Sequence, residues 1–70
     1  MKEYFMIIER DERGWYVGSV PELPGCHTQG RTIEDLTERM REAISLYLED
    51  SDESMLPPSE FVGVQKVAVS

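Results

Sequence analysis

Cysteine is nearly absent from this 70-residue sequence and occurs once, at Cys26. One cysteine cannot form an internal disulfide, and it lacks the companions at metal-ligand spacing that a zinc site requires. The sequence also has no apolar run of the ~18 residues that a membrane-spanning helix needs, and no basic segment followed by an apolar one at its start. We therefore expect one soluble, cytoplasmic domain over residues 1–70, with no disulfide or metal to stabilise it.

Basic residues are scarce, with seven Lys and Arg against fourteen Asp and Glu, which gives a net charge of −7. Since affinity for nucleic acids comes largely from neutralising phosphates, this balance argues against direct DNA or RNA binding by the chain alone. The short length limits the core as well, because a domain of this size buries only about 60% of its unfolded surface. A thin core favours a homodimer, a higher oligomer or a complex with another protein.

The first third of the sequence has the pattern of a β-hairpin. Residues 2–9 (KEYFMIIE) and 15–20 (WYVGSV) are rich in β-branched and aromatic residues, and a polar loop ending in Gly14 separates them. The first run is apolar on both faces, which predicts an inner strand of the sheet. Pro21 and Pro24 cannot donate ladder hydrogen bonds, so the second strand should end near Val20 and a third should follow over residues 26–30.

A helix is predicted from Thr32 to about residue 50. Apolar residues recur there at steps of three and four, and polar residues fill the other face. Thr32 is the predicted N-cap with Asp35 in the capping-box position, and Asp35 and Arg39 have the spacing of an i,i+4 ion pair. The apolar positions are Ile33, Leu36, Met40, Ala43, Ile44, Tyr47 and Leu48.

An acidic stretch (EDSDES) and the prolines Pro57 and Pro58 then predict a linker to a valine-rich last strand over residues 61–69. The predicted fold class is α+β, with the order β-β-β-α-β. A right-handed crossover through the helix would bring the last strand back parallel to the first and beside it. The predicted sheet order is therefore 3-2-1-4, with one helix packed on one face.

The adjacent Cys26 and His27 raise the question of a nucleophile and its base, because a thiolate paired with an imidazole is a strong nucleophile. Neighbouring residues of an extended segment point to opposite faces, which favours a packed Cys26 and a surface His27. The helix carboxylates lie along one face and do not converge on one point, as a metal-dependent nuclease requires. We therefore predict a protein that is not an enzyme, with no catalytic, metal or cofactor site.

Several segments together resemble the HicB antitoxins of bacterial and archaeal toxin–antitoxin systems. They are GWYVGSV, the loop PELPGC with the TQG that follows it, the threonine that opens the helix, and REAISLYLE in the second half of the helix. The resemblance implies a partial RNase H-like domain without nuclease activity. It also implies a partner, HicA, a small basic toxin that cleaves mRNA by means of a histidine and whose active site the antitoxin covers.

The negative charge of the chain has the sign that a basic partner needs, both for steering and for complementarity. The helix face and the proline-stiffened loop are the two candidate contact regions. Their residues are Pro21, Glu22, Leu23, Pro24, Glu34, Glu38 and Glu42. The loop has a second interpretation, in which its prolines protect the end of a strand and Gly25 supplies a positive φ.

Two other functions stay open at this point. The fold that the resemblance implies belongs to a nuclease, so a residual magnesium-dependent activity is one alternative. A stand-alone domain that binds a small molecule or a nucleic acid is the other. Many HicB antitoxins continue into a C-terminal DNA-binding domain, whereas this sequence ends at Ser70. We therefore expect no tight binding of promoter DNA by this chain.

Overall fold

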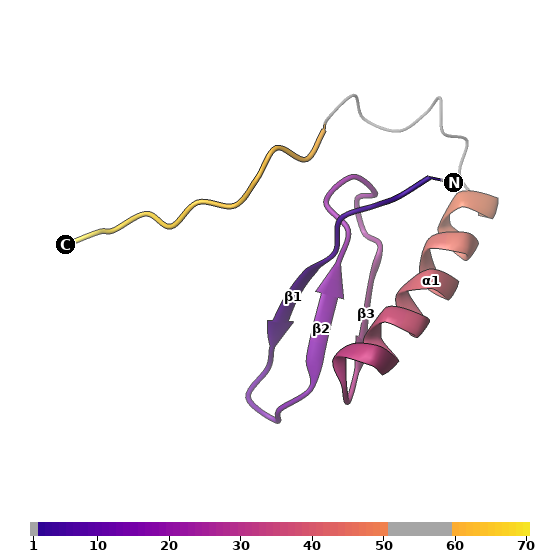
Figure 1. Cartoon of the computed structure of the whole chain (residues 1–70), viewed down its shortest axis with the longest axis horizontal. Coiled ribbons are helices and arrows are strands. Elements are labelled where there is room, and N and C mark those ends of the chain that lie inside the picture. The colour runs from indigo at the N-terminus through magenta and orange to yellow at the C-terminus, as the bar shows by residue number, and fades with distance from the viewer. Residues whose placement is uncertain (1, 51–59) are drawn as a thin grey trace.

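The structure, a computed structural model, describes residues 2–50 and 60–70. It is an α+β arrangement of β1 (Ile7–Arg10), β2 (Tyr16–Ser19), β3 (His27–Gly30) and α1 (Ile33–Asp50). The helix packs against one face of the sheet, mainly over β3 and β2 (Figure 1). The helix that the structure describes does not combine the length and apolar character that crossing a membrane requires.

The three strands form an antiparallel meander in the order β1-β2-β3, which confirms the predicted order of the first three strands. Ile7 pairs with Ser19, at the far end of the β1–β2 ladder from the turn. Residues before Ile7 would therefore lie opposite the loop that starts after Val20. Prolines there offer no ladder hydrogen bonds, so β1 is shorter than the predicted run over residues 2–9.

Asp11 organises the turn between β1 and β2. Its Oδ1 atom accepts hydrogen bonds from the backbone N–H groups of Arg13 (2.9 Å) and Trp15 (3.0 Å). Its own N–H donates to the Trp15 carbonyl at 2.9 Å. Gly14 takes a φ of +88°, a conformation that a side chain would strain. The predicted hairpin is therefore confirmed, together with the polar loop that closes it.

Two glycines let α1 lie close to the sheet. A Cβ atom on Gly30 would lie 2.8 Å from the backbone nitrogen of Leu36, and one on Gly18 would lie 3.2 Å from Met40 Cε, on the helix. The space beneath the helix is filled by a small set of side chains from the loop between β2 and β3 and from α1. The buried apolar residues are Val20, Leu23, Cys26, Leu36 and Met40.

The start of α1 agrees with the sequence. The backbone N–H of Asp35 donates to Thr32 Oγ1 at 3.0 Å, and Asp35 Oδ2 accepts a bond from the N–H of Arg31 at 3.3 Å. The predicted pair between Asp35 and Arg39 is present at 3.3 Å. Ile33 differs from its predicted core role, since it is the first residue of the helix and is 43% exposed.

The predicted fourth strand is not formed in this structure, so the order 3-2-1-4 is not confirmed. The predicted inner position of the first strand is corrected, because β1 lies at the edge of the described sheet. Residues 60–70 contain no strand and run away from the sheet (Figure 1). Among the described residues, β1 has β2 as its one neighbour and is an edge strand. The reason is that a strand needs a neighbouring backbone, and residues 60–70 do not lie along β1. The predicted linker, beyond the end of α1, falls outside the described residues.

Candidate functional site

The loop from Val20 to Cys26 is held in one shape by its own backbone. The Leu23 N–H donates to the Val20 carbonyl (3.1 Å), and the Cys26 N–H donates to the Leu23 carbonyl (2.9 Å). The Val20 N–H donates to the Cys26 carbonyl at 3.1 Å, which closes the loop at its base. Gly25 takes a φ of +85°, as the strand-end interpretation predicted. The loop is therefore a rigid element of the fold.

The four candidate residues of this loop have different environments. Leu23 is 1% exposed and packs in the core, so its contribution in this structure is to hold the loop against the body. Pro21 and Glu22 are half-buried, and Glu22 Oε1 accepts a hydrogen bond from the N–H of Phe5 at 3.1 Å. Pro24 is exposed at the outer end of the loop. Of the four, Pro24 is the one that presents its side chain to solvent.

The acidic residues proposed on the helix are accessible. Glu34, Glu38 and Glu42 are all exposed and follow one another at intervals of four residues along α1. Glu38 also pairs with Arg41 at 2.5 Å, but both side chains are about 70% exposed, and such a surface pair contributes little. α1 as a whole carries six acidic and two basic residues, a net charge of −4. The helix therefore holds more than half of the net charge of the chain.

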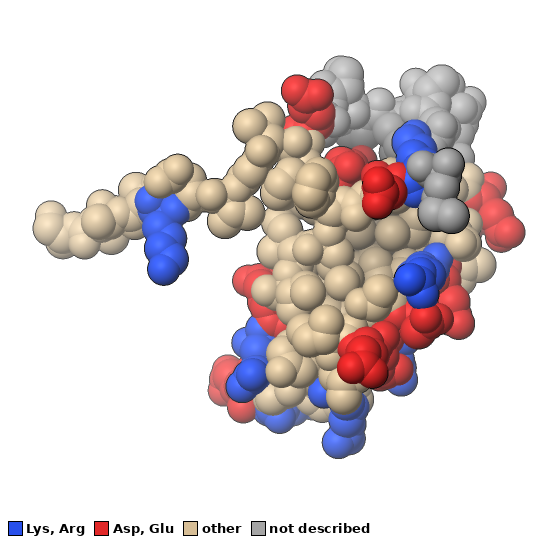
Figure 2. All heavy atoms as spheres, viewed as in Figure 1, with Lys and Arg blue, Asp and Glu red and all other residues tan. Residues whose placement is uncertain are grey.

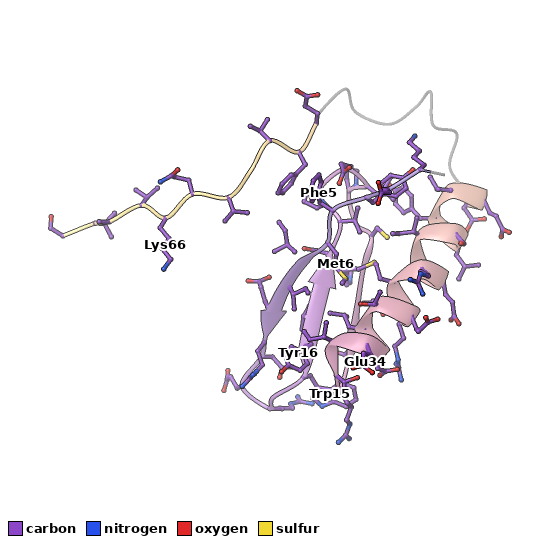
Figure 3. The ribbon with its side chains drawn as sticks, in the orientation of Figure 1. Phe5, Met6, Trp15, Tyr16, Glu34 and Lys66 are labelled. Atoms are coloured by element: carbon purple, nitrogen blue, oxygen red, sulfur yellow. The ribbon has the colours of Figure 1, made fainter. Side chains whose placement is uncertain are left out.

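Two arginines at the end of the sheet near the β1–β2 turn contact aromatic rings. They lie apart from most of the acidic face of α1. Arg10 lies over the ring of Tyr16, 5.1 Å from its centroid, and Arg31 lies over Trp15 at 4.5 Å. Basic side chains gather at this end of the molecule in Figure 2, and Figure 3 shows Trp15 and Tyr16 there. The arginines stack on aromatic rings. Within α1, Arg39 and Arg41 pair with Asp35 and Glu38, and the helix keeps a net charge of −4.

Leu46 belongs to this surface, although the sequence interpretation did not include it. It is 61% exposed and follows Glu42 by four residues. Together with Arg41, Glu42 and Ser45 it lines a shallow depression. The signal was present in the sequence, because Leu46 falls outside the apolar positions that define the core face of the helix. An exposed leucine beside carboxylates is typical of an interface that combines apolar and charged contacts.

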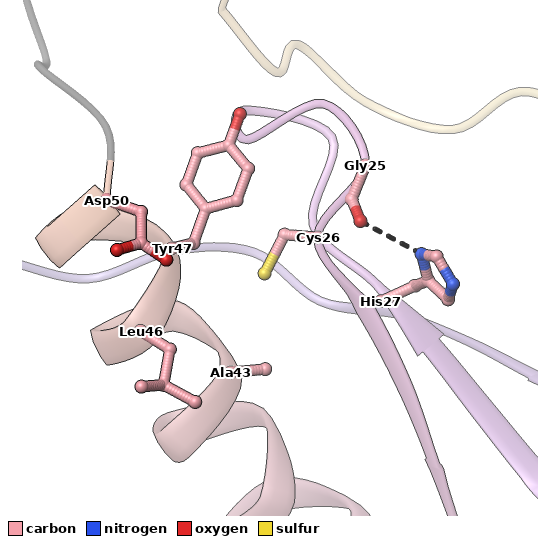
Figure 4. A pocket seen from close by; sticks show the side chains of 7 residues that line it. All are labelled: Gly25, Cys26, His27, Ala43, Leu46, Tyr47 and Asp50. Atoms are coloured by element: carbon pink, nitrogen blue, oxygen red, sulfur yellow. Dashed lines mark hydrogen bonds between the residues drawn. The ribbon is translucent and has the colours of Figure 1, made fainter.

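Cys26 and His27 do not form a catalytic pair. Figure 4 shows the Cys26 sulfur pointing toward α1, while the His27 ring points away from it. His27 Nδ1 donates to the Gly25 carbonyl at 2.9 Å. Burial raises the pKa of the Cys26 thiol, which disfavours the reactive thiolate. The predicted roles, a packed Cys26 and a surface His27, are confirmed.

No metal-binding cluster is present in the part of the chain that the structure describes, since no three His, Cys, Asp or Glu side chains converge there. The arrangement of residues 2–50 is one of exposed acids on a helix and a rigid loop. Such a surface can attract and orient a cationic macromolecule.

Comparison with known proteins assigns the chain to a family. The family model described as "HicB_like antitoxin of bacterial toxin-antitoxin system" matches residues 4–68. This chain belongs to the HicB-like antitoxin family. The assignment confirms the resemblance seen in the loop and hairpin sequences, and it extends over almost the whole chain.

Relatives of this HicB-like chain occur in distant organisms. It is 47% identical over 68 residues to a UPF0150 protein of Synechocystis, which covers 97% of this chain and 96% of that protein. It is 49% identical over 67 residues to a UPF0150 protein of Archaeoglobus fulgidus, covering 96% and 94%. A UPF0150 protein of Thermotoga maritima is 40% identical over 70 residues, covering 97% and 91%. These relatives therefore match this chain in length as well as in sequence.

Proposed function

We propose that this chain is the antitoxin of a type II toxin–antitoxin system and that it neutralises a HicA-like, mRNA-cleaving toxin by covering its active site. The observation that carries the proposal is the match of the HicB-like antitoxin family over residues 4–68. Membership of an antitoxin family implies a toxin partner and favours binding over catalysis. The complex forms in the cytoplasm, where the toxin meets mRNA.

Charge supports a basic partner. The chain has a net charge of −7, and α1 contributes −4 of it on an exposed surface. We propose that Glu34, Glu38 and Glu42 meet basic residues of the toxin. Leu46 supplies an apolar contact at the end of this row, and the rigid loop with Pro24 forms a second contact. A preorganised loop loses little conformational entropy on binding, which favours affinity.

The proposed fold of the working antitoxin is the partial RNase H-like domain that the family resemblance implies. In that fold the order 3-2-1-4 is completed by residues 61–69, which supply a fourth strand on a β1 edge. The described meander and helix supply the first four of the five elements in that order.

The decisive experiment is co-expression of this chain with the adjacent toxin gene, followed by a growth assay and a pull-down. We expect growth to be restored and a complex to be recovered. The purified antitoxin alone, incubated with RNA and Mg²⁺, should leave the RNA intact. Absence of both rescue and complex contradicts the antitoxin role, and magnesium-dependent cleavage by the chain alone points to the residual nuclease instead.

The helix face is tested by reversing its charge. The triple variant Glu34→Lys, Glu38→Lys and Glu42→Lys should slow association with the toxin by at least tenfold at low salt, since these acids steer the encounter. The matched control carries the same charge change outside α1, with the exposed residues Glu9, Glu12 and Glu60 changed to Lys. Association rates from surface plasmon resonance at two salt concentrations separate the two variants. Equal slowing in both shows that net charge matters and that the helix face does not.

A further inference from the structure

The C-terminal segment, residues 61–69, exposes an unusual amount of apolar surface for its length. Val62, Val64, Val67 and Val69 are 78–91% exposed, and the segment runs away from the body of the molecule (Figure 1). Valine favours strands because its branched side chain packs well on a sheet. A valine-rich segment without a neighbour is also an aggregation hazard, so a soluble chain needs a cover for it.

The outer edge of β1 is open in the same structure. The N–H of Asp11 bonds to the Trp15 carbonyl, and hydrogen-bonded pairs alternate along an antiparallel ladder. Ile7 and Glu9 therefore bond to β2, and the backbone groups of Ile8 and Arg10 point to the outer side. Among the described residues, no strand lies on that side. The edge can accept one more strand.

A groove beside this edge has room for the side chains of such a strand. It has a volume of about 600 Å³ and lies between the segment that leads into β1 and the helix. Tyr4 and Met6 form one wall, and Met40, Ile44 and Leu48 form much of the other. It exists because α1 packs mainly on β3 and β2 and leaves the face of β1 less covered. Its apolar residues suit branched aliphatic side chains, and polar residues complete the lining: Lys2, Glu3, Thr37, Arg41 and Ser45.

The spacing of the valines fits a single strand that carries one pair of valines on each of its two faces. Val62 and Val64 are two residues apart and share a face, as do Val67 and Val69, while the odd step between the pairs puts them on opposite faces. A strand parallel to β1 starts at the end of the sheet where Tyr4 and Met6 lie. Val62 and Val64, the first pair, would then face the groove.

We propose that two copies of this chain exchange their C-terminal segments, so that residues 61–69 of each copy form a fourth strand on the β1 edge of the other. The first residue of the segment stays against its own body, because Phe61 stacks on Phe5 with ring centroids 4.7 Å apart. Beyond Phe61 the segment runs away from its own β1 (Figure 1), so within its own chain it does not reach that edge.

A second copy of the chain would cover the β1 edge, the groove and the exposed valines at the same time. It presents the same uncovered edge and the same groove, so a reciprocal exchange under two-fold symmetry covers both segments and both edges. It also enlarges a core in which five buried apolar side chains are described. The exchange goes beyond the antitoxin role and does not depend on the toxin.

Disulfide trapping tests the exchange directly. Chains that carry Ile8→Cys are co-expressed with differently tagged chains that carry Val64→Cys, and the mixture is oxidised. Adjacent strands lie about 4.8 Å apart, within reach of a disulfide. We expect a covalent heterodimer on a non-reducing gel. The buried Cys26 should not cross-link in the wild-type chain, and replacing Val64→Cys by Val67→Cys, on the other face of the strand, should lower the yield at least fivefold.

Two outcomes overturn the exchange. If the segment folds back on its own edge, the double variant Ile8→Cys, Val64→Cys forms a bridge within one chain and stays a monomer on the gel. If no disulfide forms in either experiment, the segment does not occupy the β1 edge.

Light scattering gives an independent measurement on the full chain. The wild type should have twice the 8.1 kDa mass of one chain. Val64→Asp should weaken the dimer on the order of 100-fold, because it would bring a charged carboxylate against Tyr4, Met6 and Ile44, on the apolar side of the groove. Val64→Thr keeps the branched shape and should dimerise within about tenfold of wild type. A Val64→Asp chain that dimerises as tightly as Val64→Thr contradicts the proposal.

Discussion

Two regions of this molecule have similar sequence patterns and different structures. Residues 7–30 form a three-stranded sheet under a helix, whereas residues 60–70, which are richer in β-branched residues, form no strand. In the first region each strand lies next to another, and Gly18 and Gly30 let the helix close over them. In the second, the valines are almost fully exposed. The difference shows that strand propensity becomes a strand only where a neighbouring backbone is available.

The largest effect should come from removing a buried side chain of the first region. Leu36 is 0% exposed, so Leu36→Ala should lower the free energy of unfolding by about 2–5 kcal/mol, through lost burial and an incompletely filled cavity. Leu46→Ala, on the same helix but 61% exposed, should change it by less than about 0.5 kcal/mol. Urea denaturation followed by circular dichroism measures both. If both variants lowered the free energy of unfolding by the same amount, burial of Leu36 in the described core would not be what stabilises the fold.

A pair of glycines compares the two regions directly. Gly30→Ala should lower the free energy of unfolding by about 1–3 kcal/mol, because the new Cβ would meet backbone atoms of Leu36 at 2.8 and 3.0 Å. Gly63→Ala has nothing within 4 Å in the described structure and should change it by less than about 0.5 kcal/mol. Urea denaturation curves of the Gly30→Ala and Gly63→Ala variants measure both changes in the free energy of unfolding. A neutral Gly30→Ala would show that α1 can move away from β3 at little cost.

A smaller effect is expected at the start of the helix. Thr32→Ala removes the acceptor for the Asp35 N–H and should lower the free energy of unfolding by about 1 kcal/mol. Thr37→Ala is the matched control on the same helix. Its hydroxyl donates to the Ile33 carbonyl, a bond that serves no unpaired helix end, so its loss should change stability by less than about 0.5 kcal/mol. If both variants lose the same amount, the cap is not what stabilises this end.

The last prediction concerns reactivity and changes no residue. Burial raises the pKa of the Cys26 thiol above the ordinary 9.0, because the charged thiolate is disfavoured inside the protein. Burying the neutral thiol of Cys26 therefore contributes its full stabilisation of the fold below pH 9. This stabilisation is lost as the pH rises through the folded-state pKa, because the thiol then ionises. Iodoacetamide should therefore alkylate the folded chain more slowly than the urea-unfolded chain between pH 7 and 9. Equal rates in the two states would show that Cys26 is accessible in solution.

The sequence alone identified most local structure for clear physical reasons. A polar loop with a glycine marked the hairpin, and prolines marked the end of the second strand. The three- and four-residue steps of apolar side chains marked α1 and, with Thr32, its first turn. These features depend on residues close together in sequence, so no knowledge of the fold was needed. The PELPGC segment and its neighbours also identified the family, which the match over residues 4–68 confirmed.

The candidate surface was predicted in part. The exposure of Glu34, Glu38 and Glu42 followed from their place opposite the apolar side of the helix. Leu23 was grouped with its loop neighbours, and nothing local in the sequence shows that its side chain enters the core while Pro24 faces solvent. Burial is set by residues distant in sequence that pack around a side chain, and the loop sequence does not contain that information.

What the sequence by itself determined was the first four elements, their order and the sign of the charge on the helix, because propensity, turn chemistry and charge are properties of short segments. What the tertiary structure alone decided was which edges are covered. Because α1 lies over β3 and β2, β1 is left at the edge of the sheet with a groove beside it. Among the described residues, the last segment pairs with no strand of its own chain. Strand pairing depends on contacts between distant residues, or between molecules, and a local pattern cannot distinguish the two.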